Sequence, residues 1–211
     1  MEFRRVLCRS LATVLVRDGL GKGYTAQIVY SKPTPPGYTS KVRFVDDNFP
    51  AGGYKTYYVD VTKKGGSAKS LAVNDHTFET DFFIVRFNMK TGGITSLFDK
   101  RSNSEYVKEG GELNQLKMYL EDKKGGMKSW TINKIVKEEN VDQVESVKVI
   151  ERGPVRACVE TVKTWRKSRF IERAYIYKSY PRIEYDMEVH WLETGSDTTD
   201  SPMIRAVFPL N

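Results

Sequence analysis

The sequence predicts an all-β protein, an antiparallel β-sandwich with a small β subdomain at its N-terminal end. Tyr, Phe and Trp make up 12% of the 211 residues, which is enough to build a packed core. Apolar and polar residues alternate along several segments, with the period of two that is typical of half-buried strands. Gly and Pro divide these segments at short intervals. No window carries an apolar stripe with helical spacing over three turns.

The clearest expected strand runs over residues 183–191. Its odd-numbered positions are all apolar, whereas its even-numbered positions carry three carboxylates and a histidine. We therefore expect the odd-numbered side chains, Met187 and Trp191 among them, to face a core and the even-numbered ones to face solvent.

Other strands are expected where β-branched and aromatic residues lie between turn residues. Residues 90–93, Lys-Thr-Gly-Gly, form a turn between two of these strands. Residues 111–120 are the best candidate for a short helix, and they fit a strand equally well. The further expected strands cover residues 41–45, 54–61, 82–87, 94–98, 147–150, 155–165, 170–177 and 203–208.

A flexible, charged stretch at residues 63–69 indicates a division of the chain. We expect a small β subdomain over residues 1–66 and the main β-sandwich over residues 67–211. Residues 1–8 combine two arginines with a short apolar run, which Arg9 interrupts, and no small-residue cleavage site follows. We therefore interpret this segment as a truncated first strand and not as a signal peptide.

Charge and composition exclude several classes of partner. The net charge is +7, but Lys and Arg are interleaved with Asp and Glu, so we expect no nucleic-acid partner. No apolar run approaches the ~20 residues that span a bilayer, so we expect no membrane partner. His76, His190, Cys8 and Cys158 lack the paired spacing of a zinc module. We expect two free thiols and no metal or cofactor in this chain.

An ordered series of motifs points to a known family. The motifs lie at residues 51–59 (AGGYKTYYV), 82–87, 90–100 (KTGGITSLFDK), 114–122 (NQLKMYLED), 130, 151–156 (ERGPVR), 181–185, 190–191 and 206–209 (AVFP). In this order the series resembles the β-sandwich region of family 38 α-mannosidases, over roughly residues 40–209. The resemblance implies a galactose mutarotase-like supersandwich, which normally continues further, so we expect residues 67–211 to be incomplete at the C-terminus.

The resemblance also implies a function without catalysis. Family members carry a catalytic domain before this region, and it holds their zinc-binding His-x-Asp motif and their nucleophilic Asp. Here Thr77-Phe78 follows His76, and Trp191-Leu192 follows His190, so neither zinc ligand nor nucleophile can be assigned. We expect a non-catalytic portion of an α-mannosidase-like glycoside hydrolase, inactive alone, with zinc in the absent catalytic domain of the parent. Its expected partners are that catalytic domain and mannose-containing glycans.

Asn114, Gln115 and Trp130 are the candidate sugar-binding residues. The amides of Asn114 and Gln115 either hydrogen-bond sugar hydroxyls or satisfy the end of a strand. Trp130 follows a Gly- and Lys-rich stretch and is the best candidate for an exposed aromatic, whereas Trp165 is expected in the core.

Two carboxylates on one strand face are a further possibility to weigh, because retaining glycosidases use such a pair. Glu184, Asp186 and Glu188 lie ~7 Å apart along the strand, and we interpret them as its solvated face.

Two other functions remain open. One is an independent carbohydrate-binding or scaffold β-sandwich, which an adjoining His-x-Asp sequence would argue against. The other is a basic β-module for nucleic acid, which a steep salt dependence of binding would reveal.

Overall fold

The structure is a computed structural model that describes residues 2–8, 13–35, 37–62, 69–124, 126 and 130–211. Within these residues all regular secondary structure is β-strand, arranged in five antiparallel sheets. The expected all-β fold is therefore confirmed. No helix in this part of the chain is long and apolar enough to cross a membrane.

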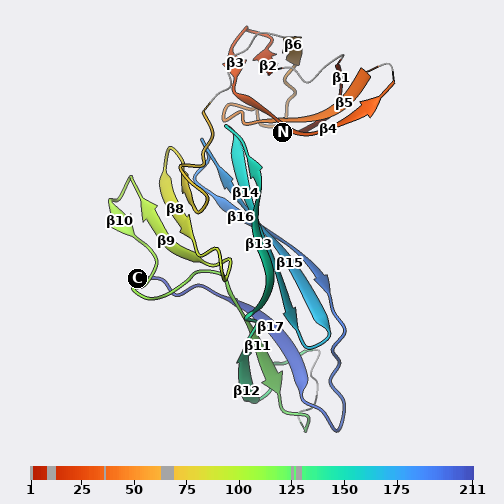
Figure 1. Ribbon diagram of the computed structural model, residues 1–211, viewed down its shortest axis with the longest axis vertical. Helices are drawn as coiled ribbons and strands as arrows, with labels where there is room; N and C mark the ends of the chain where they lie inside the picture. Colours follow the sequence, from red (N-terminus) through yellow and green to blue (C-terminus); the bar gives the residue numbers. More distant parts are fainter. Residues whose placement is uncertain (1, 9–12, 36, 63–68, 125, 127–129) are drawn as a thin grey trace.

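Two three-stranded sheets form the N-terminal unit, which lies at one end of the molecule (Figure 1). One sheet has the order β1 (Glu2–Cys8), β5 (Gly37–Phe44), β4 (Ala26–Thr34), and the other has the order β3 (Gly23–Tyr24), β2 (Thr13–Asp18), β6 (Tyr57–Thr62). Val14 and Val16 of β2 pack with Val42 and Phe44 of β5 in the core between them. The alternation of these residues along each strand explains why one face of each sheet is buried.

The main sheet of the sandwich follows later in the chain. Its strands, in spatial order, are β13 (Gln143–Arg152), β14 (Arg156–Trp165), β15 (Ser168–Tyr177) and β16 (Ile183–His190). Each of the strands expected in this region is present. β14 is buried on both faces, because it is a central strand whose outer face is covered by side chains of its neighbours.

Two smaller sheets cover the inner face of the main sheet. They are β10 (Ser104–Glu105), β9 (Ile94–Asp99), β8 (Phe83–Phe87) and β7 (Thr77–Glu79), and then β12 (Ile135–Asn140), β11 (Gln115–Glu121) and β17 (Ser201–Val207). The first buries Val85 and Ile94 against Val159 and Ile176, in what we call the first core cluster. The second buries Leu116, Met118 and Leu120 against Trp165 and Phe170, in the second core cluster.

β16 is an edge strand, and its inner face is only partly covered. Ile183 and Tyr185 pack against the first core cluster, and Trp191 packs against the second. Met187 and Val189 lie between them and are 37% and 41% exposed. The expectation that every odd-numbered side chain faces a core is therefore wrong for these two residues, because the opposing sheets cover the two ends of β16 and not its middle.

A polar junction joins the N-terminal unit to the main sheet. The buried Gln27 of β4 accepts hydrogen bonds from the backbone N–H groups of Val155 and Arg156, at 3.1 and 2.9 Å, through Oε1. Its amide nitrogen donates to Glu151, which also accepts two short hydrogen bonds from the Arg156 guanidinium. A Cβ at Gly153 would lie 1.8 Å from Gln27 Cδ, so glycine permits this close approach.

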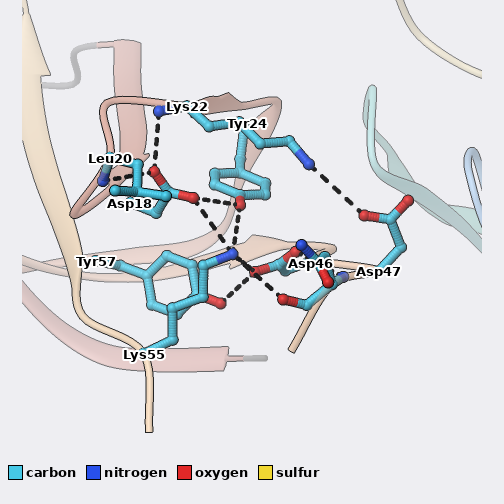
Figure 2. Close-up of polar contacts among 9 residues, drawn as sticks. Asp18, Leu20, Lys22, Tyr24, Asp46, Asp47, Lys55 and Tyr57 are labelled. Atoms are coloured by element: carbon cyan, nitrogen blue, oxygen red, sulfur yellow. Dashed lines mark hydrogen bonds and ion pairs between the residues drawn. The ribbon is translucent and has the colours of Figure 1, made fainter. Parts of the chain in front are cut away.

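A half-buried lysine, Lys55, organises the loops of the N-terminal unit (Figure 2). Lys55 Nζ donates to Asp46 Oδ2 at 2.6 Å and to Tyr24 Oη at 2.9 Å, and it lies 3.3 Å from Asp18 Oδ2. Tyr57 also donates to Asp46. Burial raises the pKa of Tyr57 to about 12, and its hydrogen bond to Asp46 adds to this shift. Burial opposes the charge on Asp46, but hydrogen bonds from Lys55 and Tyr57 outweigh it and hold the pKa of Asp46 well below its ordinary value.

The Asp46 network should make the N-terminal unit sensitive to acid. Because the folded state holds the Asp46 pKa below the unfolded value of about 4, this carboxylate stabilises the fold above that pH. Its contribution is lost as the pH falls further toward the folded pKa. Asp46→Asn should therefore unfold at lower urea concentration at pH 7 than the parent, and the difference should shrink below about pH 4. Asp47→Asn is the matched control, because its side chain is exposed, and it should follow the parent at every pH.

Candidate functional site

A polar layer separates the two core clusters of the sandwich. The inward-facing side chains of β14 are apolar at Ala157 and Val159, polar at Thr161 and Lys163, and apolar again at Trp165. Glu172 of β15 lies opposite Thr161 in the register of the sheet. Thr161, Lys163 and Glu172 are each no more than 5% exposed. These three residues therefore place one positive and one negative charge inside the sandwich.

Asn114 completes this buried network. Lys163 Nζ lies 3.4 Å from Glu172 Oε2, and Asn114 Nδ2 donates to Glu172 Oε1 at 2.8 Å. Asn114 precedes β11 with a left-handed backbone, φ 61°, which turns its side chain toward β15. Because a buried charge is tolerated only when it is paired and hydrogen-bonded, Asn114 and Lys163 together supply the partners that the buried carboxyl group of Glu172 requires.

The turn that follows β8 lies against the same layer. Gly92, with φ +78°, approaches Thr161 so closely that a Cβ would lie 2.1 Å from Thr161 Oγ1. Glu112 fixes this turn from the other side, because it accepts hydrogen bonds from Asn88 Nδ2 and Thr91 Oγ1, both at 2.6 Å. The turn, the start of β11 and the middle of β14 are thus held together by short contacts.

A hollow of about 140 Å³ opens beside this network. We call it the Lys163 hollow. Its wall combines the buried ammonium of Lys163 with amide, hydroxyl, carboxylate and aliphatic groups from neighbouring strands and loops. The lining residues are Thr91, Gly93, Glu112, Asn114, Gln115, Leu116, Asn140, Val141, Asp142, Val144 and Lys163.

The structure brings two of the three candidate sugar-binding residues together. Asn114 and Gln115 both line the Lys163 hollow, although Asn114 is buried and its amide nitrogen is committed to Glu172. Trp130 lies elsewhere, in the loop between β11 and β12, and is 85% exposed. Gln115 begins β11, and the seven residues of this strand, about 20 Å in length, lead from it to that loop. Figure 1 shows the β11–β12 hairpin at the end of the molecule opposite the N-terminal unit.

Lys163, Glu172 and Glu112 were not expected from the sequence as members of a site. The residue pattern of β14 and β15 could have identified two of them. Lys163 and Glu172 occupy inward positions of otherwise apolar, alternating segments. A polar residue at an inward position of a central strand must have a partner. That rule identifies the two residues, whereas Glu112 has no comparable pattern.

The residues of this chain do not fit the zinc site that the resemblance implies for a catalytic domain. Among the described residues, no three or more His, Cys, Asp or Glu side chains are grouped so that they could hold a metal ion. His76 and His190 are both exposed and lie in separate parts of the sandwich. Cys158 is free and buried, and burial raises the pKa of its thiol to about 12, so it is not a reactive thiolate.

Comparison with known proteins identifies the family. A model of the glycosyl hydrolases family 38 C-terminal domain matches residues 78–211, which is more than half of the chain. A search of curated proteins gives no match. The matched region begins within β7, contains β8 to β17 and the Lys163 hollow, and excludes the N-terminal unit. The chain therefore belongs to glycosyl hydrolase family 38, through the C-terminal domain of that family.

Proposed function

We propose that this chain is the non-catalytic β-sandwich portion of an α-mannosidase-like glycoside hydrolase, where it borders the sugar site and supports the catalytic domain. The observation that carries the proposal is the family match over residues 78–211. An exposed indole and a hollow lined by amides suit the apolar face and the hydroxyls of a pyranose, respectively. Trp130 and Gln115 are the residues that would contact mannose-containing glycans, and Asn114 would position the start of β11.

We also propose that residues 1–66 form a separate subdomain that is attached to residues 67–211. The described strands up to Thr62 pair only with one another, which supports this division. The hydrogen bonds of Gln27 to Val155 and Arg156 supply a fixed attachment. In this arrangement the N-terminal subdomain would set the orientation of the sandwich relative to a preceding domain.

The test requires a protein that joins residues 1–211 to a family 38 catalytic domain. Trp130→Ala should lower kcat/KM for an aryl α-mannoside or a mannosyl glycan by about threefold to tenfold, since aromatic contacts are worth about 0.5–1.5 kcal/mol. Zinc content should not change. Tyr54→Ala is the matched control, because Tyr54 is 90% exposed and lies in the N-terminal unit. Residues 1–211 alone should show no turnover with added zinc.

Two results would argue against the proposal. Wild-type kinetics for changes at Trp130, Gln115 and Asn114 would remove these residues from any sugar site. Zinc-dependent turnover that follows the purified 211-residue chain would exclude a non-catalytic role. An independent carbohydrate-binding sandwich, the second candidate, would instead bind mannosides tightly without any catalytic domain.

A further inference from the structure

We propose that the Lys163 hollow is a binding site for one edge of a neutral polyhydroxylated ring, such as a pyranose, held by Gln115, Asn140 and Lys163. The inference rests on the proposed function, because that function places glycans beside the sandwich. It goes further in assigning a sugar contact to the Lys163 hollow, which lies at the end of β11 opposite the loop that carries Trp130, and in giving Lys163 a role in binding.

The polar side of the hollow offers hydrogen bonds that suit hydroxyl groups. An ammonium group carries three N–H donors. Within the described part of the chain, Lys163 Nζ is paired with Glu172 Oε2 at 3.4 Å, so donor capacity remains for a ligand oxygen. The half-buried Gln115 and the exposed Asn140 also line the hollow, and each amide offers a donor and an acceptor. A ring hydroxyl, which both donates and accepts, matches this mixture.

Part of the lining of the hollow is aliphatic. Leu116 and Val141 are buried, and Val144 is half-buried at the rim. A pyranose presents C–H groups between its hydroxyls, so its edge can contact an aliphatic wall while its oxygens reach polar groups. The volume of about 140 Å³ is below the roughly 300–1,000 Å³ of pockets that enclose a drug-sized ligand. One edge of a single ring therefore enters, and a glycan chain does not.

The charges around the hollow favour a neutral ligand. Glu172 already balances the ammonium of Lys163. Glu112 and Asp142 also line the hollow, and Glu112 is occupied by hydrogen bonds from Asn88 and Thr91. The wall is thus net negative, so a sugar acid would be repelled where a neutral sugar would not.

The proposal is tested by methyl NMR on the 211-residue chain titrated with methyl α-mannopyranoside. The methyl signals of Leu116, Val141 and Val144 should shift and saturate, with a dissociation constant in roughly the millimolar range, because only one edge of the ring is held. Val144→Phe, which fills the hollow from its rim, should abolish these shifts. Gln115→Leu, a second variant at the polar wall, should weaken binding about tenfold. The corresponding uronic acid, methyl α-mannopyranosiduronate, should bind about fivefold more weakly than the mannoside.

The control is Tyr54→Ala, at an exposed residue of the N-terminal unit, which should leave the hollow shifts unchanged. Shifts that do not saturate, or that persist in both the Val144→Phe and Gln115→Leu variants, would overturn the proposal. Perturbation of the Trp130 indole without any shift at the hollow would overturn this site and leave the proposed function standing. Unchanged spectra at both places would count against the hollow, and the kinetic test of Trp130→Ala would then decide the proposed function separately.

Discussion

Lys163→Met should lower the free energy of unfolding by about 3 kcal/mol or more, because it leaves the Glu172 carboxylate buried without its cation. Lys163 and Glu172 are 5% and 4% exposed, so water cannot replace the lost partner without opening the sandwich. Met has nearly the length and volume of the aliphatic part of Lys, so the change tests charge more than packing. Urea unfolding followed by tryptophan fluorescence measures the loss.

The double variant Lys163→Met/Glu172→Gln separates charge from shape. The neutral glutamine side chain in place of Glu172 still accepts the hydrogen bond from Asn114, and no charge remains buried, so part of the lost stability should return. Lys148→Met is the matched control, because Lys148 is exposed on β13, and it should change stability by less than about 0.5 kcal/mol. A similarly small effect for Lys163→Met would mean that the contact between Lys163 and Glu172 contributes little to the stability of the fold.

The strands were predictable because the alternation of apolar and polar residues along one segment indicates which side chains are buried. Residues 155–165 and 170–177 were expected as strands and form β14 and β15, and the short apolar run at 147–150 lies within the longer β13. The expected core position of Trp165 is confirmed, as is the exposure of Trp130. Each of these predictions depends only on the residues near it in the chain.

The Lys163 hollow and the exposed middle of β16 were not predictable in the same way. The hollow forms where the start of β11, the end of β12 and the inner face of β14 lie side by side. These elements are far apart in sequence. Met187 and Val189 follow a perfect alternation, yet their exposure is decided by where the two opposing sheets end. Alternation assigns a side chain to a face, but it does not say what covers that face.

The sequence also left the three candidate sugar-binding residues as one set, whereas the fold divides them. Asn114 and Gln115 precede and begin β11, and Trp130 follows it. A strand is a rigid spacer of about 3.3 Å per residue, so residues at its two ends cannot share one small site. Once β11 was known to be a strand and not a helix, this separation followed from its length.

Gly92→Ala should lower the free energy of unfolding by about 3 kcal/mol, the largest expected loss after that of Lys163→Met. A left-handed backbone strains any residue with a Cβ by about 1–2 kcal/mol. At φ +78° the new Cβ would also lie 2.1 Å from Oγ1, 2.5 Å from Cγ2 and 2.8 Å from Cβ of Thr161. Rotation of the Thr161 side chain cannot relieve all three contacts, so the turn must move away from β14, and such overpacking costs about 1–3 kcal/mol.

Gly110→Ala isolates the backbone part of this effect. Gly110 has a similar left-handed backbone, φ +71°, but no atom lies within 4 Å of the position of its Cβ. Its substitution should therefore cost only the conformational strain, about 1 kcal/mol. The difference between the two variants in urea unfolding measures the close approach of the turn to Thr161. Equal losses would mean that the turn at residues 90–93 does not rest on β14, and the Lys163 hollow would then lack the wall that Thr91 and Gly93 give it.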